Sequence, residues 1–255
     1  MQVIYLFAFF ILGTLLGSFY TVVGTRLPKN EDFIKTRSYC DNCHHKLSLL
    51  DMIPIVSYLL LKKRCRYCHA KINNLSTYME IFTGVLFGLS YYVFGLSYEL
   101  FIALGIISLL IILSVSDISY MIIPDEVLIF FSGYFIIINT LKSGIILSLA
   151  SIASGLIMFG FMYLIMLMGN FLFKKESLGG GDIKLMFVVG LVLHPFLGLM
   201  VIFIASFIAL PISLLILIQK KQNIVPFGPF LLIGFTFMYF TQINIDMIVE
   251  FIRSF

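Results

Sequence analysis

The chain has 255 residues, of which 60% are hydrophobic and 12% are charged, and its mean hydropathy is +1.06. A soluble globular domain carries charged residues at about twice this frequency, so the composition excludes a soluble globule. We therefore predict an all-α polytopic membrane protein. The net charge of +4 is small. The positions of the Lys and Arg residues are more informative, because cations near helix ends set the orientation of membrane helices.

The first predicted element is a transmembrane helix within residues 1–23. Residues 3–23 form an uncharged run of 21 residues, which is long enough to cross a hydrocarbon core of about 30 Å. A cleaved signal peptide would begin with basic residues, whereas the first cations here, Arg26 and Lys29, follow the apolar run. The positive-inside rule then places the N-terminus outside the cytoplasm.

A hydrophilic segment at residues 24–78 follows, and we predict that it forms a cytoplasmic domain between the first and second transmembrane helices. It contains ten of the 17 Lys and Arg residues, which the positive-inside rule assigns to the cytoplasm. An apolar stretch at residues 52–61 is too short to span a membrane and contains Pro54, so we predict a small buried or interfacial helix there. The cations could contact anionic lipid headgroups, or they could belong to a second active site.

All four cysteines of the chain lie in this segment, as two Cys-x-x-Cys pairs separated by 21 residues. This spacing is typical of a tetrahedral zinc site with four thiolate ligands. The alternative is a pair of disulfides, which a reducing cytoplasm disfavours. A segment of this size has too little core to be secure alone, so a structural zinc ion would hold it together. The predicted metal ligands are Cys40, Cys43, Cys65 and Cys68.

Seven further apolar runs complete the chain and, with the first, predict about eight transmembrane helices. Several runs are shorter than the roughly 20 residues that a perpendicular helix needs, so their boundaries are approximate, and the fifth of the seven is short enough to be a half-helix. The seven runs are residues 79–94, 101–116, 127–141, 145–168, 183–193, 197–218 and 229–240. We therefore expect a seven-helix membrane domain at residues 79–255.

The distribution of charge supports an eight-helix topology with both termini outside the cytoplasm. In this topology the cytoplasmic loops hold the ten cations of residues 24–78 and five more, so that 15 of the 17 Lys and Arg residues lie on the cytoplasmic side. Only Lys142 and Arg253 fall on the outer side. We therefore predict a multi-pass protein of the cytoplasmic membrane.

Two aspartates reach the cytoplasmic ends of helices in this topology. Asp117 ends the third helix, where a negative charge opposes the helix dipole, so capping does not explain it and the alternative is a solvated loop residue. Asp182 begins the sixth helix, where capping of the helix N-terminus is the alternative. By contrast, Asp125 and Glu126 follow Pro124 at the start of the fourth helix, and we predict that they cap it.

A glycine-rich turn before Asp182 indicates that the two aspartates form a site. Gly179, Gly180 and Gly181 allow positive φ and the close approach of another chain, so this turn could hold a peptide beside the carboxylate. Lys184 belongs to the same predicted active-site loop.

Two apposed carboxylates can share one proton, because like charges a few ångströms apart cannot both ionise. The ionised carboxylate can take a proton from water as the water attacks a peptide carbonyl, and the protonated one can donate a hydrogen bond to the carbonyl oxygen. This chemistry requires neither a covalent intermediate nor a metal.

These patterns resemble those of the bacterial type IV prepilin peptidases, which are Gly-x-Gly-Asp intramembrane aspartyl proteases. The motifs that carry the resemblance are Asp117 with Ile123-Pro124-Asp125; Leu178-Gly179-Gly180-Gly181-Asp182-Ile183-Lys184-Leu185; Gly17-Ser18-Phe19 to Arg26-Leu27-Pro28; and Phe227-Gly228-Pro229-Phe230-Leu231. The four cysteines also match the cytoplasmic loop of this family, so the resemblance extends along nearly the whole chain.

The resemblance implies that Asp117 and Asp182 are the catalytic pair. In the family this pair removes a short basic leader from pilin-like precursors at the cytoplasmic membrane face, cutting after a glycine. The same enzymes usually methylate the new N-terminus from S-adenosylmethionine, and residues 24–78 would be the methyltransferase part. The implied partners are pilin-like precursors with a basic leader and an apolar N-terminal helix, together with the lipid bilayer, and no nucleic acid is expected.

Glu80 is the best candidate for a residue of the methyltransferase activity, because an acid within an apolar membrane segment usually has a functional role. The alternative is an acid near a helix start whose carboxylate snorkels to water. The chain departs from the family pattern at Leu75-Ser76-Thr77 and at Thr21, and these departures bear on methylation and not on cleavage.

The residues alone also allow two other classes of protein, a transporter and a membrane scaffold. A transporter would also use carboxylates and glycine-broken helices, but its sites usually lie near the bilayer midplane within inverted repeats, and the sequence shows no repeat. A membrane scaffold held together by zinc would explain the cysteines, but it would leave Asp117 and the glycine triplet unexplained.

Overall fold

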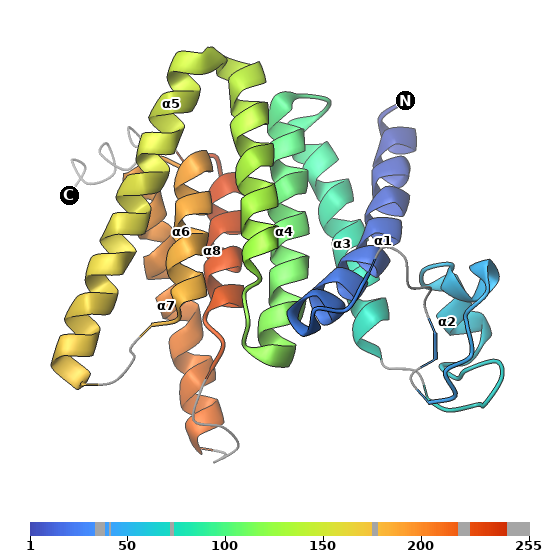
Figure 1. The fold of residues 1–255 in the computed structure, drawn as a ribbon. Helices are drawn as coiled ribbons and strands as arrows, with labels where there is room; N and C mark the ends of the chain where they lie inside the picture. The colour runs from blue at the N-terminus through green and yellow to red at the C-terminus, as the bar shows by residue number, and fades with distance from the viewer. Residues whose placement is uncertain (34–38, 41, 72–73, 175–177, 219–224, 244–255) are drawn as a thin grey trace. The chain divides into compact units, whose positions relative to one another are not determined.

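The computed structural model of the chain is helical in the residues that it describes, apart from two isolated β-bridges (Figure 1). The described residues are 1–33, 39–40, 42–71, 74–174, 178–218 and 225–243. The bridges pair Tyr39 with Lys46 and Arg64 with Lys71. The all-α prediction is confirmed for this part of the chain.

The chain forms two compact units, Met1–Leu96 (unit 1) and Ser97–Phe255 (unit 2), and each is described by itself. The domain boundaries predicted from the sequence stay a prediction, because compact units need not coincide with domains. The predicted domains are residues 1–23, 24–78 and 79–255.

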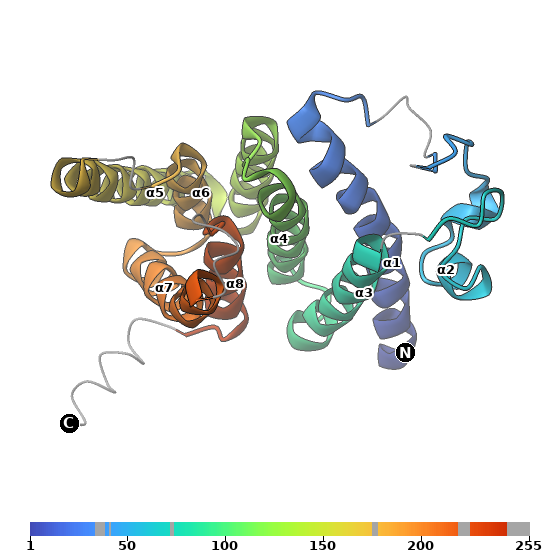
Figure 2. The same cartoon turned by 90° about the horizontal axis from the view of Figure 1, so that it is seen from below.

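Unit 1 is built on two long helices, α1 (Gln2–Arg26) and α3 (Asn74–Phe94), which pack side by side (Figure 1, Figure 2). Three short helical elements lie between them in the sequence: η1 (Leu27–Lys29), η2 (Leu49–Met52) and α2 (Val56–Leu60). The helix predicted over residues 52–61 is therefore shorter than expected, since the chain turns at Pro54 and Ile55 before α2 begins.

Small residues allow α1 and α3 to approach closely. A Cβ atom added at Gly13 would lie 2.7 Å from the carbonyl oxygen of Thr83 and 2.8 Å from Cα of Gly84, which are backbone atoms of α3. A Cβ atom added at Gly17 would lie 2.8 Å from the hydroxyl oxygen of Thr83. Membrane helices commonly bring their backbones together through small residues, since van der Waals packing drives their association in lipid. The contact between α1 and α3 therefore depends on glycine at position 13.

We expect Gly13→Ala to weaken the packing of α1 on α3, because the new methyl group would meet backbone atoms that cannot move without separating the helices. Overpacking of this kind costs about 1–3 kcal/mol. Gly88→Ala is a matched control, since its Cβ atom would meet neighbours no closer than 3.8 Å. Unfolding of the purified full chain by titration with SDS should show an earlier midpoint for Gly13→Ala only. Equal midpoints for the two variants would contradict the close contact.

Unit 2 is a bundle of helices (Figure 1, Figure 2). The described helices of this unit are α4 (Tyr98–Tyr120), α5 (Asp125–Phe173), α6 (Gly180–Val192), α7 (Pro195–Ile218) and α8 (Gly228–Phe240). α4 is buried along most of its length and contacts both α5 and α8. α5 packs in turn against α6, and α7 packs against α8. α4 is thus the most buried of these helices, whereas much of the apolar surface of α5 and α7 is exposed.

α5 bends sharply at Gly144, so that it consists of two legs (Figure 1). Gly144 has φ 82° and ψ 172°, a backbone conformation that residues with a Cβ atom rarely adopt. The hydroxyl groups of Thr140 and Ser148 lie 2.9 Å apart across the bend and form a hydrogen bond. The bend separates the apolar runs predicted at residues 127–141 and 145–168, and α5 contains both.

Four helical segments in the described residues are long and apolar enough to cross a membrane, by length and composition: Gln2–Lys29, Tyr98–Tyr120, Asp125–Leu172 and Pro195–Ile216. These segments support the prediction of a multi-pass membrane protein. The count of eight spans is not confirmed, because α3, α6 and α8 do not meet the same criterion.

Part of the predicted topology falls on residues that the structure does not describe. The predicted outer C-terminus lies there with Arg253, as do Lys35, Arg37, Lys175, Lys220 and Lys221.

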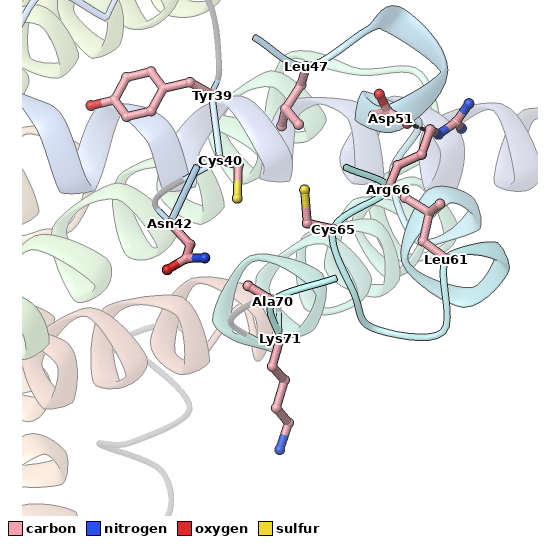
Figure 3. Close-up of a pocket in the computed structure, with 10 residues that line it drawn as sticks. All are labelled: Tyr39, Cys40, Asn42, Leu47, Asp51, Leu61, Cys65, Arg66, Ala70 and Lys71. Carbon is pink, nitrogen blue, oxygen red and sulfur yellow. Dashed lines mark ion pairs between the residues drawn. The ribbon is translucent and has the colours of Figure 1, made fainter. Parts of the chain in front are cut away.

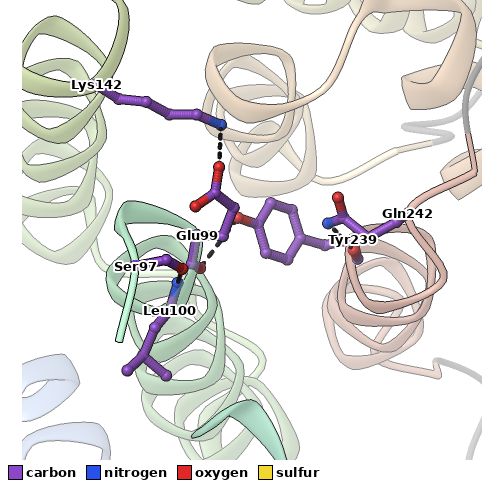
Figure 4. Close-up of polar contacts among 6 residues, drawn as sticks. All are labelled: Ser97, Glu99, Leu100, Lys142, Tyr239 and Gln242. Carbon is purple, nitrogen blue, oxygen red and sulfur yellow. Dashed lines mark hydrogen bonds and ion pairs between the residues drawn. The ribbon is translucent and has the colours of Figure 1, made fainter. Parts of the chain in front are cut away.

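A polar cluster joins three helices at one end of unit 2 (Figure 4). Glu99, in the first turn of α4, forms an ion pair of 3.0 Å with Lys142, which lies close to the bend of α5. The hydroxyl of Tyr239, near the end of α8, donates to the backbone carbonyl of Glu99 at 3.1 Å. A helix rises about 1.5 Å per residue, so this cluster lies about 27 Å along α4 from Asp117. The three helices are therefore fixed to one another at the end that lies away from Asp117.

Candidate functional site

Asp117 lies in the last turn of α4, where it is buried with 6% of its surface exposed. The helix ends because Met121 adopts a left-handed conformation, with φ 55°, and the amide of Met121 donates to the carbonyl oxygen of Asp117 at 2.8 Å. The hydroxyl of Ser116 donates to the carbonyl oxygen of Ile122 at 2.5 Å and holds the turn that follows. One carboxylate oxygen of Asp117, Oδ2, is buried without a hydrogen-bond partner in the described part of the chain. The alternative that Asp117 is a solvated loop residue is therefore wrong.

Asp182 is the third residue of α6 and is also buried, with 8% of its surface exposed. The N-cap of this helix is Gly179, whose carbonyl oxygen accepts from the amide of Asp182 at 3.2 Å. Among the described residues, no side chain caps α6 by a hydrogen bond. The alternative that Asp182 is an N-cap is therefore wrong, since its carboxylate lies inside the first turn.

The two aspartates come together around Ile123, in the connection between α4 and α5. A Cβ atom added at Gly181 would lie 2.7 Å from Cβ of Ile123, so the start of α6 lies directly against this connection. A Cβ atom added at Gly228, the first residue of α8, would lie 2.8 Å from Oδ2 of Asp117 and 3.1 Å from Cδ1 of Ile123. The charges of Asp117 and Asp182 interact electrostatically. One end of α4 and the starts of α6 and α8 therefore meet at two buried carboxylates.

The three glycines before Asp182 have different surroundings. Gly181 faces Ile123, so its missing side chain allows close packing within the chain. A Cβ atom added at Gly180 would meet none of the described residues within 4 Å, and one added at Gly179 would meet only the carboxylate of Asp182, at 3.4 Å from Oδ2. The open space beside Asp182 therefore lies at Gly179 and Gly180.

Lys184, from the same predicted loop, forms an ion pair with Asp125. Its Nζ atom lies 2.8 Å and 2.7 Å from the two carboxylate oxygens. Asp125 is the first residue of α5, whose N-cap is Pro124, and no side-chain hydrogen bond caps this helix among the described residues. The prediction that Asp125 and Glu126 cap α5 through their side chains is therefore wrong, whereas their predicted place at the start of the helix, where acids are favourable, is confirmed. The paired side chains are 50% and 55% exposed, so the pair contributes only about 0–1 kcal/mol.

Sequence reasoning missed Ile123 and Gly228 as parts of this site. One side chain is apolar and the other residue has none, so neither residue type indicates a role. Both lie within segments that carry the family resemblance, and that is the only signal in the sequence that marks them.

We expect Gly181→Ala to destabilise the junction of α4 and α6, because its Cβ atom would lie 2.7 Å from Cβ of Ile123. The expected cost is about 1–3 kcal/mol. Gly180→Ala is a matched control, since its Cβ atom would meet no described neighbour and alanine favours a helix over glycine by about 1 kcal/mol. Thermal unfolding of the full chain in detergent should show a lower midpoint for Gly181→Ala only. An equal decrease in both variants would mean that Ile123 does not pack on Gly181.

In unit 1 the four cysteines lie on two turns that share a backbone hydrogen bond and a left-handed histidine. In the first turn the amide of His44 donates to the carbonyl oxygen of Cys40 at 2.8 Å, and in the second the amide of His69 donates to the carbonyl oxygen of Cys65 at 3.0 Å. His44 and His69 both adopt left-handed conformations, with φ 55° and 56°. We call these two Cys-x-x-Cys turns the knuckles.

The four sulfur atoms of the knuckles lie within 4.8 Å of one another, and those of Cys40 and Cys68 are 3.8 Å apart. A tetrahedral site with metal–sulfur bonds of about 2.3 Å has sulfur–sulfur edges of about 3.8 Å. All four cysteines are free, so the structure does not contain the alternative pair of disulfides. The cluster can therefore hold a metal ion.

A cavity of about 160 Å³ lies beside the knuckles, and the side chains of Cys40 and Cys65 line it (Figure 3). Asp51 lies at its wall and forms an ion pair of 2.9 Å with Arg66. Asp51 also accepts hydrogen bonds from the hydroxyl of Ser48 at 2.7 Å and from its amide at 3.1 Å. These bonds and Arg66 hold the pKa of the Asp51 carboxyl below its usual value. The ion pair joins η2 to the second knuckle.

Glu80 lies in the second turn of α3 and is buried, with 6% of its surface exposed. Its Oε2 atom accepts from the amide of Ile55 at 2.9 Å, and its Oε1 atom accepts from the hydroxyl of Ser76 at 3.1 Å. The alternative that Glu80 snorkels to water is therefore wrong. The hydroxyl of Tyr58, in α2, also donates to Oδ1 of Asn74 at the start of α3.

The described residues thus form a bundle of apolar helices with two buried aspartates where helix ends meet, and a separate four-cysteine cluster. The chain belongs to the type IV leader peptidase family. Residues 104–214 match the model of this family, and residues 11–94 match the model of the bacterial Peptidase A24 N-terminal domain.

Similar proteins extend this match over most of the chain. A prepilin leader peptidase/N-methyltransferase of Vibrio cholerae is 31% identical over 262 residues, which cover 94% of this chain and 98% of that protein. A protein of the same name from Bacillus subtilis is 39% identical over 186 residues, which cover 72% of each chain. One from Neisseria gonorrhoeae is 28% identical over 248 residues, covering 88% of this chain and 86% of that protein. No solved structure matches the chain. Membership of this family sets aside the transporter and scaffold alternatives.

Proposed function

We propose that the chain cleaves the leader peptide of type IV prepilin-like precursors, with Asp117 and Asp182 as an acid–base pair. The observation that carries this proposal is the meeting of two buried carboxylates, one of which keeps an oxygen without a hydrogen-bond partner in the described residues. A buried acceptor without a partner costs about 1–3 kcal/mol. Such a cost is understandable where the oxygen is used to bind a water molecule or a peptide.

In this mechanism Asp117 and Asp182 share one proton. The ionised carboxylate takes a proton from water as the water oxygen bonds to the carbonyl carbon of the peptide, and the carboxylic acid donates a hydrogen bond to the carbonyl oxygen. The C–N bond then breaks, and the proton taken from water passes to the leaving amine. One water molecule is consumed, and the two carboxyl groups end in their starting protonation states.

The space at Gly179 and Gly180 supports binding of the precursor in an extended form beside Asp182. A transmembrane helix has no free backbone carbonyl, so the cleavage region must unwind before water can attack it. The backbone groups of a glycine-rich turn can pair with an extended peptide. In this proposal Gly181 and Lys184 do not contact the precursor, because the first packs on Ile123 and the second pairs with Asp125.

For the topology we propose eight passes, with both aspartates and the knuckles at the cytoplasmic face and both termini outside. The charge distribution of the sequence supports this arrangement. The bend at Gly144 supports it as well, since it divides the 49 residues of α5 into two legs that can each cross the bilayer.

We also propose that the knuckles bind one structural zinc ion through Cys40, Cys43, Cys65 and Cys68. The support is the sulfur–sulfur distance of 3.8 Å between Cys40 and Cys68, together with a ligand set of four thiolates. Zinc bound there would stabilise a segment whose described helices have at most five residues.

The names of the relatives support a second activity, and we propose that the chain methylates the new N-terminus with S-adenosylmethionine as the methyl donor. The cavity beside the knuckles does not fit this donor as a whole. Its volume is about 160 Å³, whereas sites for ligands of this size occupy about 300–1,000 Å³. No step of methylation is therefore assigned to the residues that line it.

Asp117→Asn and Asp182→Asn should each abolish cleavage, because an amide cannot exchange the proton that the pair must share. Loss of general acid–base catalysis lowers a rate by about 10²–10⁴-fold. Asp125→Asn is the matched control and should keep most of the activity, since it loses only an exposed ion pair. The assay uses full-length variants in liposomes and a precursor with a basic leader, a glycine and an apolar helix. Cleavage near the unmutated rate by either principal variant would contradict the assignment.

Removal of a zinc ligand should release the metal and loosen the segment that carries the knuckles. Cys40→Ser and Cys65→Ser should reduce zinc from one per chain to almost none and make this segment sensitive to protease. His44→Asn is the control, because asparagine tolerates the left-handed conformation at φ 55° and no thiolate is lost. Metal analysis and limited proteolysis of reduced protein measure both effects. Absence of zinc from the unmutated protein would contradict the site.

A further inference from the structure

Ile55 has a backbone conformation that a β-branched residue almost never adopts. Its φ is +61°, in the left-handed region. The amide of Val56 donates to the carbonyl oxygen of Pro54 at 2.5 Å, so Ile55 is the central residue of a three-residue turn. Turns of this size with positive φ at the centre are rare and strained. A strained backbone persists only where its surroundings hold it, which makes the residues around Ile55 informative.

The group that holds this turn is the carboxylate of Glu80. Oε2 of Glu80 accepts the amide of Ile55 at 2.9 Å, and the hydroxyl of Ser76 fixes the other oxygen at 3.1 Å. A buried carboxylate requires hydrogen-bond donors, and a donor from the backbone of Ile55 is available only while the turn keeps its shape. A Cβ atom added at Gly17 would lie 3.0 Å from Cα of Glu80, so α1 packs against α3 at the same level. Glu80 is therefore held on a rigid part of unit 1.

The turn connects the two helices of unit 1 to the segment that carries the cysteines. It precedes α2, where Tyr58 makes a second bond to α3 through Asn74. It follows Asp51, whose ion pair with Arg66 reaches the second knuckle. The contact after the turn therefore leads to α3 and the contact before it leads to the second knuckle, and Glu80 holds the turn between them.

We infer that Glu80 is a positioning residue, whose carboxylate holds the Pro54–Val56 turn in its strained conformation and thereby attaches the knuckle segment to α3. Both oxygens of this carboxylate accept hydrogen bonds from unit 1, and these two bonds fix its orientation toward the turn. The link to methylation rests on the proposed function, in which unit 1 serves that activity. The attachment of the knuckles does not depend on that proposal.

The test compares two substitutions of Glu80 in the full-length protein. Glu80→Gln keeps an acceptor for the Ile55 amide but removes the charge, whereas Glu80→Leu removes the acceptor and keeps a similar volume. Limited proteolysis in detergent should cut the knuckle segment on the order of tenfold faster in Glu80→Leu and at nearly the unmutated rate in Glu80→Gln. Unmutated cleavage rates of precursor by both variants would show that unit 2 is intact.

Rescue by Ile55→Gly tests the role of strain. Glycine adopts positive φ without cost, so the turn should need less support, and the effect of Glu80→Leu on proteolysis should fall severalfold in the Ile55→Gly background. An effect of Glu80→Leu that is the same in both backgrounds would overturn the role of the strained turn. Proteolysis of Glu80→Leu at the unmutated rate would overturn the attachment itself.

Mass spectrometry of the processed precursor shows whether Glu80 positions the turn or takes part in methylation itself. Methylated product from Glu80→Gln together with unmethylated product from Glu80→Leu would support positioning, because only the acceptor differs. Loss of methylation in Glu80→Gln as complete as in Glu80→Leu would overturn it, since the charge itself would then be required. If the unmutated enzyme gives only unmethylated product, the proposed methylation fails, and the proteolysis comparison still decides the role of Glu80.

Discussion

The contact on which the rest of unit 2 depends is that of Ile123 with two glycines. Because Gly181 and Gly228 have no Cβ atom, α6 and α8 both begin within van der Waals distance of one side chain. Asp182 follows the first of these glycines, and the carboxylate of Asp117 lies against the second. Two acids that are far apart in the sequence are thus brought together by backbone packing. Sites carried by packed helices hold their geometry more closely than sites carried by loops.

The two ends of α4 show different uses of polar groups. At its start, Glu99 pairs with Lys142, and Tyr239 donates to the carbonyl oxygen of Glu99, so these groups satisfy one another and fix the helices. At its other end Asp117 is buried with an unsatisfied oxygen in the described structure. A bundle that is fixed at one end can tolerate this cost at the other.

Local patterns are sufficient to predict the helical fold, the four-cysteine cluster and the positions of both aspartates near helix ends, but not the burial of these aspartates. The cysteines could be predicted because each pair is closed within a few residues, and the knuckles share a backbone hydrogen bond and a left-handed histidine. The pairing of Lys184 with Asp125 could not be predicted, since 59 residues separate them and capping of a helix already accounted for an acid at position 125. The conformation of Ile55 could not be predicted either. A β-branched residue is disfavoured at positive φ, and the hydrogen bond from its amide to Glu80 comes from a distant part of the sequence.

The buried acids of the chain differ in the partners of their carboxylate oxygens, and these partners indicate different roles. Both oxygens of Glu80 accept hydrogen bonds from its own unit, and Asp51 is held by Ser48 and Arg66. Each of these carboxylates therefore acts as a structural link between segments of unit 1. Asp117 differs because no side chain of the described residues pairs with its Oδ2 atom, whereas Oδ1 of Asp51, which also accepts no hydrogen bond, lies 2.9 Å from Nε of Arg66. Burial alone does not separate these roles, since Glu80 and Asp117 are each 6% exposed, but the state of the acceptor atoms does.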